Sequence, residues 1–430
     1  MMKAKVITLG CKVNQYESEA MLSSLLQHGF AAAEDKETAD VVILNSCTVT
    51  AESDRKVRQI FRRAKKDNPD AVMVLTGCMA QAFPEDARRL EEADIILGTS
   101  NRKRLVPDLL AFLSARQRII DIAPHTNDEK FENLNVENFT GRTRAFVKIE
   151  DGCNRFCSYC IIPYARGRVR SKPLEDLKAE LAGLGANGYK EVVLTGINLS
   201  AYGQEFGLHL CDAIEAACAT PGIERVRLGS LEPEQLSEDV IRRMAKQKKL
   251  CPQFHLSLQS GCDATLKRMN RHYTADEYRT IVRNLRAAFE NAAITTDIMV
   301  GFAGETDEEF AESLAFAEEI AFAKVHVFAY SRRPGTRAYD MGDQLTNAVK
   351  EARSHEMIRV TTATQQAFFK AQIGHTEEVL FEREIQKSVW EGYSMNYTPV
   401  AVVSGTSLAG EIRSVRIESC TDTHCMGAVL

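Results

Sequence analysis

The stretch Cys153-Asn-Arg-Phe-Cys157-Ser-Tyr-Cys160 contains three closely spaced cysteines, a pattern typical of a metal-binding loop. Its cysteines are spaced C-x3-C-x2-C, and a tyrosine stands directly before the third one. Iron–sulfur clusters usually take four thiolates, so three cysteines predict a [4Fe–4S] cluster whose fourth iron is left for another ligand. Structural zinc is the alternative, but zinc favours C-x2-4-C pairs and four protein ligands, and the sequence has no fourth Cys or His close by.

The composition is that of a globular protein. The chain has 430 residues, of which 44% are hydrophobic and 26% charged, which predicts two or three domains of ordinary composition. Neither a signal peptide nor an apolar run near the ~20 residues of a membrane span is visible. We therefore expect a cytoplasmic protein without a membrane partner. In that setting the twelve cysteines indicate metal ligands and free thiols rather than disulfides.

Three β-rich apolar runs near the N-terminus each lead into a cysteine: Lys5-Val-Ile-Thr-Leu-Gly-Cys11, Val41-Val-Ile-Leu-Asn-Ser-Cys47 and Ala71-Val-Met-Val-Leu-Thr-Gly-Cys78. Helix-like stretches at residues 16–28, 52–66 and 84–93 alternate with them, and a fourth apolar run follows at residues 95–99. This alternation predicts a parallel α/β sheet. Parallel strands end at one edge, where such sheets build their sites. We therefore predict a second metal site on these three cysteines, with buried core thiols as the alternative.

The middle of the chain predicts a partial (β/α)6 TIM-like barrel. Strand-like runs alternate with helical stretches and lie at residues 145–150, 191–195, 225–228, 254–258, 294–300 and 324–329. The cysteine loop directly follows the first of these runs, at the strand end where barrels carry their chemistry.

The C-terminal segment predicts a small antiparallel β-barrel. A long helix at about 346–371 precedes strand-like runs at residues 378–381, 397–403, 411–418 and 425–430. The predicted division is an N-terminal domain at 1–122, a polar linker at 123–143, the larger barrel at 144–371 and the small barrel at 372–430.

The charge pattern suggests an anionic partner despite a net charge of −5. Seven lysines and arginines lie between residues 55 and 66 without an acid among them. A second group directly follows the cysteine loop and consists of Arg166, Arg168, Arg170 and Lys172. Local fields matter more than net charge, so we predict that the second group contacts RNA phosphates. A solvated surface without a partner is the alternative.

Taken together, these segments resemble the methylthiotransferase branch of the radical S-adenosylmethionine (SAM) superfamily over nearly the whole chain. The segments Gly10-Cys11, Asn45-Ser46-Cys47 and Gly77-Cys78-Met79-Ala80-Gln81 resemble its cluster-binding domain, the middle resembles its radical SAM domain, and residues from about 372 resemble its TRAM domain. Four segments are similar to the tRNA N6-threonylcarbamoyladenosine (t6A) branch: residues 10–18, 152–167, 195–203 and 229–233. Ala303 departs from the family, which usually has proline there.

The resemblance implies two [4Fe–4S] clusters, one on Cys153, Cys157 and Cys160 and the other on Cys11, Cys47 and Cys78. It also implies two SAM molecules per turnover, an electron donor and a sulfur source. The reaction would place a methylthio group on C2 of t6A at position 37, in a tRNA anticodon stem-loop. The first cluster would pass an electron to SAM and so produce a radical that removes the C2 hydrogen. The second cluster would carry the sulfur.

The same resemblance suggests contacts to SAM or substrate for Tyr159, Thr195, Gly196, Glu232, Gln259 and Asp297, with barrel packing as the alternative. His255 and His326 are interpreted as hydrogen-bonded core residues rather than ligands. For the basic group, we predict that Arg168→Ala and Arg170→Ala both raise the apparent Michaelis constant for tRNA.

Other functions remain open at this point. Related chemistry could act on isopentenyl-adenosine in tRNA or on a ribosomal-protein aspartate, although residues 195–203 argue against both. A zinc-containing RNA-binding protein would be colourless and would not cleave SAM.

Overall fold

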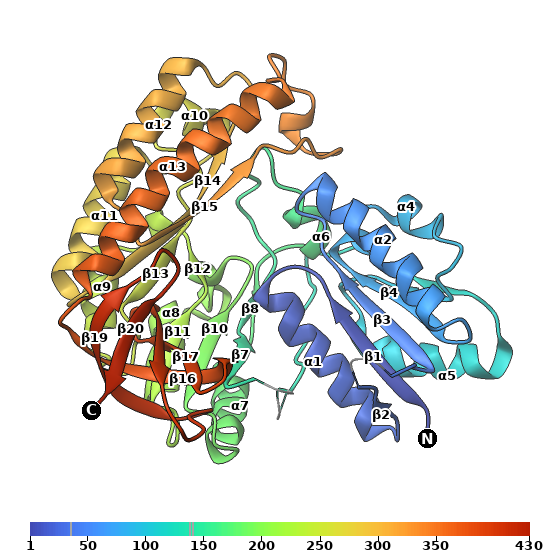
Figure 1. Ribbon diagram of the computed structural model, residues 1–430. Coiled ribbons are helices and arrows are strands. Elements are labelled where there is room, and N and C mark those ends of the chain that lie inside the picture. The colour runs from blue at the N-terminus through green and yellow to red at the C-terminus, as the bar shows by residue number, and fades with distance from the viewer. Residues whose placement is uncertain (35–36, 137–138, 140–141) are drawn as a thin grey trace.

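The computed structural model describes residues 1–34, 37–136, 139 and 142–430. An N-terminal sheet domain stands beside a larger barrel, and a small barrel closes the chain (Figure 1). The fold is therefore mixed α/β, as predicted. Within the described ranges, none of the helices is long and apolar enough to cross a membrane.

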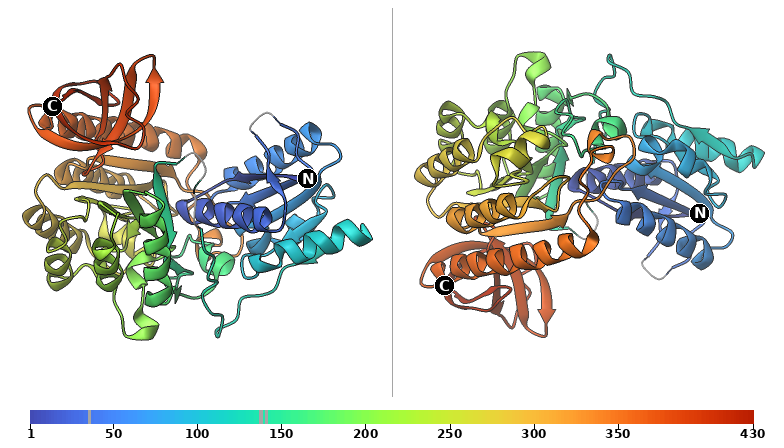
Figure 2. Two further views of the ribbon diagram at one scale, coloured as in Figure 1. Left: turned by 90° about the horizontal axis from the view of Figure 1, so that it is seen from below. Right: turned by 90° about the horizontal axis from the view of Figure 1, so that it is seen from above.

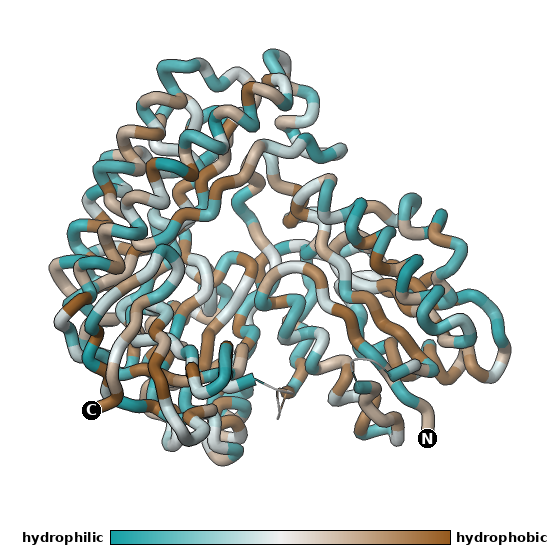
Figure 3. The backbone as a smooth tube through the Cα atoms, viewed as in Figure 1, coloured by the Kyte–Doolittle hydropathy of each residue, from teal (hydrophilic) through white to brown (hydrophobic). Residues whose placement is uncertain are grey.

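The N-terminal sheet has the strand order β2-β1-β3-β4-β5-β6, and every ladder in it is parallel. The strands are β1 (Lys3–Thr8), β2 (Ala31–Ala32), β3 (Val41–Ser46), β4 (Val72–Gly77), β5 (Ile95–Leu97) and β6 (Ile119–Asp121). The central strands β3 and β4 are buried along their whole length and form the apolar centre of this domain (Figure 3). The predicted parallel sheet is confirmed, with β2 and β6 as additional edge strands.

Helices cover both faces of this sheet. On one face α1 (Lys12–Gln27) and α5 (Leu105–Ala115) pack on alternate residues of β3 and β4. The opposite face carries α2 (Ala51–Asp67), α3 (Cys78–Ala82) and α4 (Pro84–Arg88). Residues inside two-sided parallel sheets must be apolar on both faces, which is why β3 and β4 read as continuous apolar runs. The sequence patterns did not predict α5.

The larger barrel contains the predicted strands in two parallel sheets. These are β11-β10-β7 and β12-β13-β14-β15, joined by a parallel bridge between Val226 and Leu250. The strands are β7 (Arg144–Lys148), β10 (Glu191–Thr195), β11 (Arg225–Leu228), β12 (Ser230–Leu231), β13 (Gln253–Leu256), β14 (Ala293–Val300) and β15 (Lys324–Ala329). Around them lie α7 (Leu174–Ala186), α8 (Leu210–Ala219), α9 (Glu238–Ala245), α10 (Asp263–Arg268), α11 (Ala275–Ala288) and α12 (Asp307–Ile320).

A short hairpin holds the cysteine loop. β8 (Glu150–Asp151) pairs in antiparallel fashion with β9 (Arg170–Ser171), and the loop with α6 (Ile162–Arg166) lies between them. The hairpin brings the two ends of the loop together at the end of β7. The loop therefore stands where the sequence placed it.

The C-terminal barrel differs from the prediction in one ladder. After α13 (Asn347–Ala371), the strands are β16 (Thr376–Gln386), β17 (Val389–Ser394), β18 (Pro399–Val403), β19 (Ile412–Cys420) and β20 (Cys425–Val429), closed in the order β16-β17-β18-β20-β19. The predicted small barrel is confirmed; four of its ladders are antiparallel, and the β18–β20 ladder is parallel. In the described chain this ring has five strands, and an odd number cannot alternate in direction all the way round.

The C-terminal barrel lies beside α13 and away from the N-terminal sheet (Figure 2). Part of the predicted linker packs between the other two domains, where the ring of Phe131 lies 5.4 Å from Lys148 Nζ and 5.9 Å from Lys172 Nζ. Linker residues 137–138 and 140–141 are outside the described residues. The domain limits themselves remain a prediction.

Candidate cofactor and substrate site

The backbone of the cysteine loop is fixed at both ends. Cys153 N–H donates to the carbonyl of Gly167 at 3.0 Å, and Cys160 N–H donates to the carbonyl of Cys157 at 3.0 Å. Gly152 has φ +86°, and a Cβ there would lie 1.9 Å from Arg168 O. A side chain at this position is therefore excluded, because it would push the first cysteine away from the hairpin.

Donors surround the sulfur atoms of this loop. The amide of Arg155 lies 3.5 Å from Cys153 Sγ, and Arg271 Nη1 lies 3.2 Å from Cys157 Sγ. Burial raises the pKa of Cys153 to about 12 and also raises the pKa of Cys160. Thiolates are the metal-binding form, and metal binding provides the free energy for deprotonation. N–H donors and a guanidinium at the sulfurs suit an iron–sulfur cluster, whose potential depends on such contacts.

The second cysteine set lies at one edge of the N-terminal sheet. Cys11 follows β1, Cys47 follows β3 and Cys78 begins α3 after β4. A Cβ on Gly10 would be 2.9 Å from Cys47 Cβ, so the first two strand ends touch. Burial raises the pKa of Cys78 to about 12; Arg166 opposes this shift, and Cys47 and Cys11 add to it. The three thiols therefore interact, and Arg166 Nε, 3.2 Å from Cys78 Sγ, supplies a cation suited to a cluster.

Gly77 controls how closely Cys78 approaches Cys47. Its φ is +98°, and a Cβ would lie 2.5 Å from the backbone N and O of Ser46. We predict that Gly77→Ala lowers the free energy of unfolding by about 1–3 kcal/mol and reduces the iron bound by the N-terminal cysteines, as measured by denaturant unfolding and iron analysis.

Gly29→Ala is the matched control for that variant. Gly29 lies in the same domain with φ +85°, but a Cβ there meets nothing within 4 Å. It carries the same backbone strain without the clash, so its iron content should equal that of the wild type. Equal iron loss in both variants would contradict the steric argument.

A cavity of about 400 Å³ lies beside the cysteine loop, where the N-terminal domain meets the larger barrel. It is bordered by the segment after Cys47, by the cysteine loop and by the ends of barrel strands, through residues Val49, Thr50, Ser53, Tyr159, Cys160, Ile161, Ile162, Gln259, Asp297, Met299, Phe328, Ala329, Tyr330 and Ser331. We call it the cofactor cavity. Cross-domain bonds hold its walls: Ala51 N–H donates to Ser331 Oγ at 3.1 Å, and Arg333 Nη2 donates to Asp54 Oδ2 at 2.6 Å.

Comparison with known proteins agrees with this architecture. Residues 3–98 match the model described as Uncharacterized protein family UPF0004, and residues 147–317 match the Radical SAM superfamily. The chain is 36% identical over 416 residues to the threonylcarbamoyladenosine tRNA methylthiotransferase MtaB of Bacillus subtilis, covering 95% of this chain and 92% of that protein. The chain belongs to the methylthiotransferase family of radical SAM enzymes.

Two further comparisons define the breadth of this family. The MtaB protein of Thermotoga maritima is 37% identical over 423 residues, which cover 98% of this chain and 96% of that protein. The tRNA-2-methylthio-N(6)-dimethylallyladenosine synthase of Pelotomaculum thermopropionicum is 35% identical over 438 residues, covering 99% and 97%. This chain is therefore almost equally identical in sequence to relatives that are named for two different nucleosides.

Among solved structures, the radical SAM methyltransferase TsrM of Kitasatospora setae, with cobalamin and a [4Fe–4S] cluster bound, matches with a TM-score of 0.57. The match covers 79% of this chain and 74% of TsrM at 15% identity, so it concerns the fold.

The six residues predicted to contact SAM or substrate fall into two groups. Tyr159, Gln259 and Asp297 line the cofactor cavity. Thr195 is buried at the end of β10, and Gly196 packs on Glu150, whose Oε2 would lie 2.6 Å from a Cβ. These two, and Glu232, do not line the cavity, and the contacts of all six with a ligand remain predictions.

Glu232 is linked to the cysteine loop through Arg271, a residue the motifs did not single out. Arg271 forms an ion pair with Glu232 and donates to Cys157 Sγ. Burial raises the pKa of Glu232, and Arg271 opposes that shift. A carboxylate thus orients the guanidinium that faces the sulfur.

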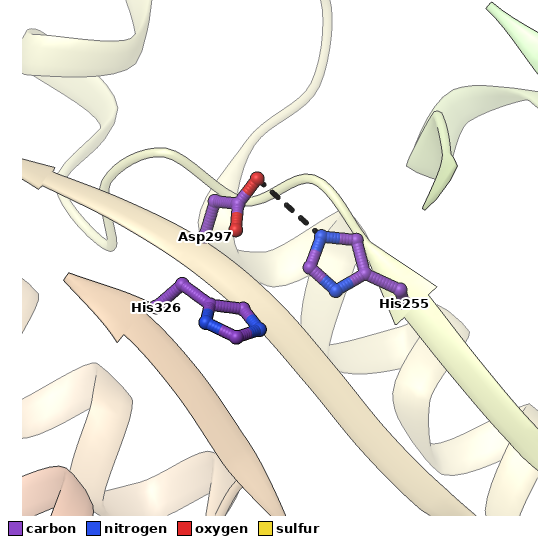
Figure 4. Close-up of side chains that lie close together, drawn as sticks. All are labelled: His255, Asp297 and His326. Carbon is purple, nitrogen blue, oxygen red and sulfur yellow. Dashed lines mark ion pairs between the residues drawn. The ribbon is translucent and has the colours of Figure 1, made fainter. Parts of the chain in front are cut away.

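Two histidines and Asp297 face one another inside the barrel (Figure 4). His255 Nε2 lies 3.4 Å from Asp297 Oδ2, and its Nδ1 is 3.1 Å from Thr295 Oγ1. His326 stands directly beside Asp297 in the β14–β15 register. His255 is hydrogen-bonded as predicted, whereas His326 is exposed, so its interpretation as a core residue was wrong. However, one ligand atom from each residue lies within 4.8 Å of the others, so the group could hold a metal ion, which the sequence interpretation did not foresee.

The structure corrects the prediction for the basic group. The exposed fractions of Arg166, Arg170 and Lys172 are 0%, 6% and 0%, and their charges are compensated by Glu17, Asp151, Glu129 and Glu180. Their predicted contact with RNA phosphates is wrong, because they have no surface to offer. Arg168 is exposed, with its guanidinium 4.9 Å from the ring centroid of Phe156.

The buried charges form a network between the N-terminal domain and the barrel. Glu17 of α1 accepts from Lys148 Nζ at 2.7 Å and from Arg166 Nη1 at 2.5 Å, and Arg102 Nη2 lies 3.0 Å from it. Burial would raise the pKa of Glu17, but these cations lower it to about 2. Glu17 is therefore charged at neutral pH, and it fixes α6 and β7 against α1.

Proposed function

We propose that this protein methylthiolates C2 of the adenine of t6A at position 37 of tRNA. Four relatives named for that activity are 34–37% identical over most of the chain. The observation that carries the proposal is the cofactor cavity, which borders both the segment after Cys47 and Cys160. A base in that cavity would be next to both sites that the reaction requires. Its place of action is the cytoplasm, where tRNA is modified.

The cysteine sets would hold the cofactors: a [4Fe–4S] cluster and SAM at Cys153, Cys157 and Cys160, and a second [4Fe–4S] cluster at Cys11, Cys47 and Cys78. Bound cluster and SAM supply the one-electron chemistry that an unactivated C2–H bond needs. Two SAM molecules, an electron donor and a sulfur source complete the reaction. Side chains of this protein would position the cofactors. The ring of Tyr159 packs edge-on against the ring of Phe302, with 6.3 Å between the centroids, and the guanidinium of Arg271 places a positive charge beside Cys157 Sγ.

The target base must leave the anticodon-loop stack to enter this cavity, as bases do in other enzymes that modify them. The apolar wall formed by Ile161, Ile162, Met299 and Phe328 would keep water from the reacting carbon. The chain's contribution is therefore placement and shielding.

Nucleoside mass spectrometry tests the proposal. Anaerobically reconstituted protein is incubated with reductant, SAM, sulfide and tRNA that carries either t6A or dimethylallyladenosine. We expect the exchange of hydrogen for a methylthio group on t6A. The 35% identity to the Pelotomaculum enzyme makes dimethylallyladenosine the competing substrate, and modification of that nucleoside alone would overturn the assignment.

Arg168 is the member of the basic group that remains available to tRNA. We predict that Arg168→Ala weakens tRNA binding and reduces the slope of log K against log salt by about 1, because one phosphate contact is lost. Fluorescence titrations at several salt concentrations measure this slope. Arg242→Ala on α9, where exposed Arg242 lies 2.6 Å from Asp239 and outside both basic groups, is the control for net charge. An unchanged slope in Arg168→Ala would remove it from the RNA interface.

A further inference from the structure

A second cavity of about 400 Å³ lies where the three predicted domains meet, and we call it the junction cavity. Its walls come from the start of α1, from β7, β10 and β11 and from the C-terminal barrel: Lys12, Gln15, Arg142, Thr143, Arg144, Phe146, Val193, Arg227, Glu382, Arg383 and Tyr397. Cations outnumber acids in this lining. The cavity is therefore suited to an anion.

The arginines deep in this cavity are already neutralised. Arg227 donates to both oxygens of Glu191, at 3.0 and 3.2 Å, and to Met395 O at 2.9 Å. Arg144 forms a 2.6 Å ion pair with Glu382 and lies 3.5 Å from Glu191. These acids hold the two guanidiniums in place, and they leave little negative charge for another cation.

Lys12 differs from these arginines. Among the described residues, its Nζ has neither a hydrogen-bond nor an ion-pair partner, and the side chain is exposed to the cavity solvent. The amine stands on the first residue of α1, directly after Cys11. Burial and the charges of Arg227 and Arg144 lower the pKa of Lys12 to about 8, so the unpaired amine is still mostly protonated at pH 7.

An aromatic pair makes the far wall rigid. The rings of Tyr393 and Tyr397 stack at 4.6 Å with an interplanar angle of 17°. Arg144 lies 5.0 Å from both ring centroids, and Arg227 lies 4.6 Å from that of Tyr397. The two rings and the two guanidiniums therefore hold one another in place, which leaves little freedom for this wall to move.

Strands of the same barrel line both cavities: β7, β10 and β11 contribute to the junction cavity, and β14 and β15 contribute to the cofactor cavity. Tyr397 lines the junction cavity and also lines a pocket of about 250 Å³ together with Thr295 and His326, so the junction cavity adjoins β14 and β15. Asp297, beside His326, lines the cofactor cavity. An adenine whose C2 lies near the cysteines could thus extend its N6 substituent toward Lys12.

We propose that Lys12 binds the carboxylate of the threonylcarbamoyl group on the substrate base and so selects this base over adenosines with neutral N6 substituents. The inference rests on the proposed function. A dimethylallyl group would leave the ammonium unpaired, whereas a carboxylate forms a charge-assisted hydrogen bond with it. A tRNA phosphate offers the same anionic chemistry, and the experiment separates these two sources.

The test is a cycle in which both partners are changed. Dissociation constants of reconstituted holoenzyme are measured for one tRNA with t6A at position 37 and for the same tRNA with unmodified adenosine. We expect Lys12→Met to weaken binding of the t6A form about 10- to 100-fold and to leave binding of the unmodified form unchanged. Lys12→Arg, which keeps the charge, should restore most of the preference.

Controls keep the outcomes distinct. Lys248→Met, at an exposed residue outside both basic groups and outside the cavity lining, removes the same charge and should alter neither constant. Equal weakening on both tRNAs by Lys12→Met would identify a phosphate contact instead, and no weakening on either would exclude Lys12 as an anion site. Iron content checks that Cys11 still binds. If the wild-type protein binds t6A-tRNA more tightly than unmodified tRNA but never methylthiolates it, the proposed function fails while the carboxylate contact stands.

Discussion

Replacing Arg166 with methionine is expected to lower the free energy of unfolding by about 3–5 kcal/mol. Arg166 is fully buried and donates to Glu17, to Asn14 Oδ1 at 2.6 Å and to Cys78 Sγ. Methionine fills much of the same volume but leaves these acceptors without their donor. Leaving the buried Glu17 carboxylate without its partner costs more free energy than the packing of the methionine side chain can return.

Denaturant unfolding of the reconstituted protein measures this loss, and Arg168→Met supplies the control. Arg168 is two residues away but exposed, so its replacement should change stability by less than about 0.5 kcal/mol. Arg166→Met should also release iron from the N-terminal cysteines, because its Nε faces Cys78. Wild-type stability in Arg166→Met would mean that the two domains are held together without the network.

Serine at Cys153, Cys157 and Cys160 together is expected to abolish both SAM cleavage and methylthiolation, down to the background without protein. Serine at Cys11, Cys47 and Cys78 should abolish methylthiolation but leave SAM cleavage. The reason is that Cys160 lines the cofactor cavity, whereas the N-terminal set reaches it only through the segment after Cys47, so the two sets would carry different parts of the chemistry. Each triple variant should retain half of the wild-type iron.

Iron analysis, product analysis of SAM and nucleoside mass spectrometry on the same samples separate these effects. Cys211→Ser, at a buried thiol of α8 outside both sets, is the control and should keep full iron and activity. Retained methylthiolation in the N-terminal triple variant would show that the second site is dispensable and would leave a single cluster.

Much of this architecture could be predicted from the sequence because the apolar runs lead directly into cysteines. β3 and β4 are buried on both faces, so they appear as unbroken apolar stretches, and the cysteines after them are fixed to one edge by parallel topology. The edge strands β2 and β6 are two and three residues long, too short for any periodicity. In the C-terminal barrel, β17 includes Glu391 and Gly392, which break an apolar pattern.

The buried charges were beyond sequence reasoning for a different reason. A run such as Arg166 to Lys172 looks like a surface because it contains no acid, although Glu180, which pairs with Lys172, is only eight residues away from it. The main partner of Arg166, Glu17, is 149 residues away. Lys12 was also overlooked, although it follows Cys11 in a motif that was recognised for its cysteine. That its amine is unpaired can be seen only in the folded protein, where β11 and the C-terminal barrel form the rest of the cavity.

The walls of the junction cavity come from opposite ends of the chain, with Lys12 on one side and Tyr397 on the other. At translation rates of roughly 5–20 residues per second, about 20–80 s separate the emergence of these two residues from the ribosome. The N-terminal sheet and the barrel strands can fold in that interval and present their cysteines for iron loading. If the junction cavity selects the substrate as we propose, discrimination among nucleosides is the last property that the growing polypeptide acquires, and we expect a chain truncated before the final barrel to bind iron without preferring t6A.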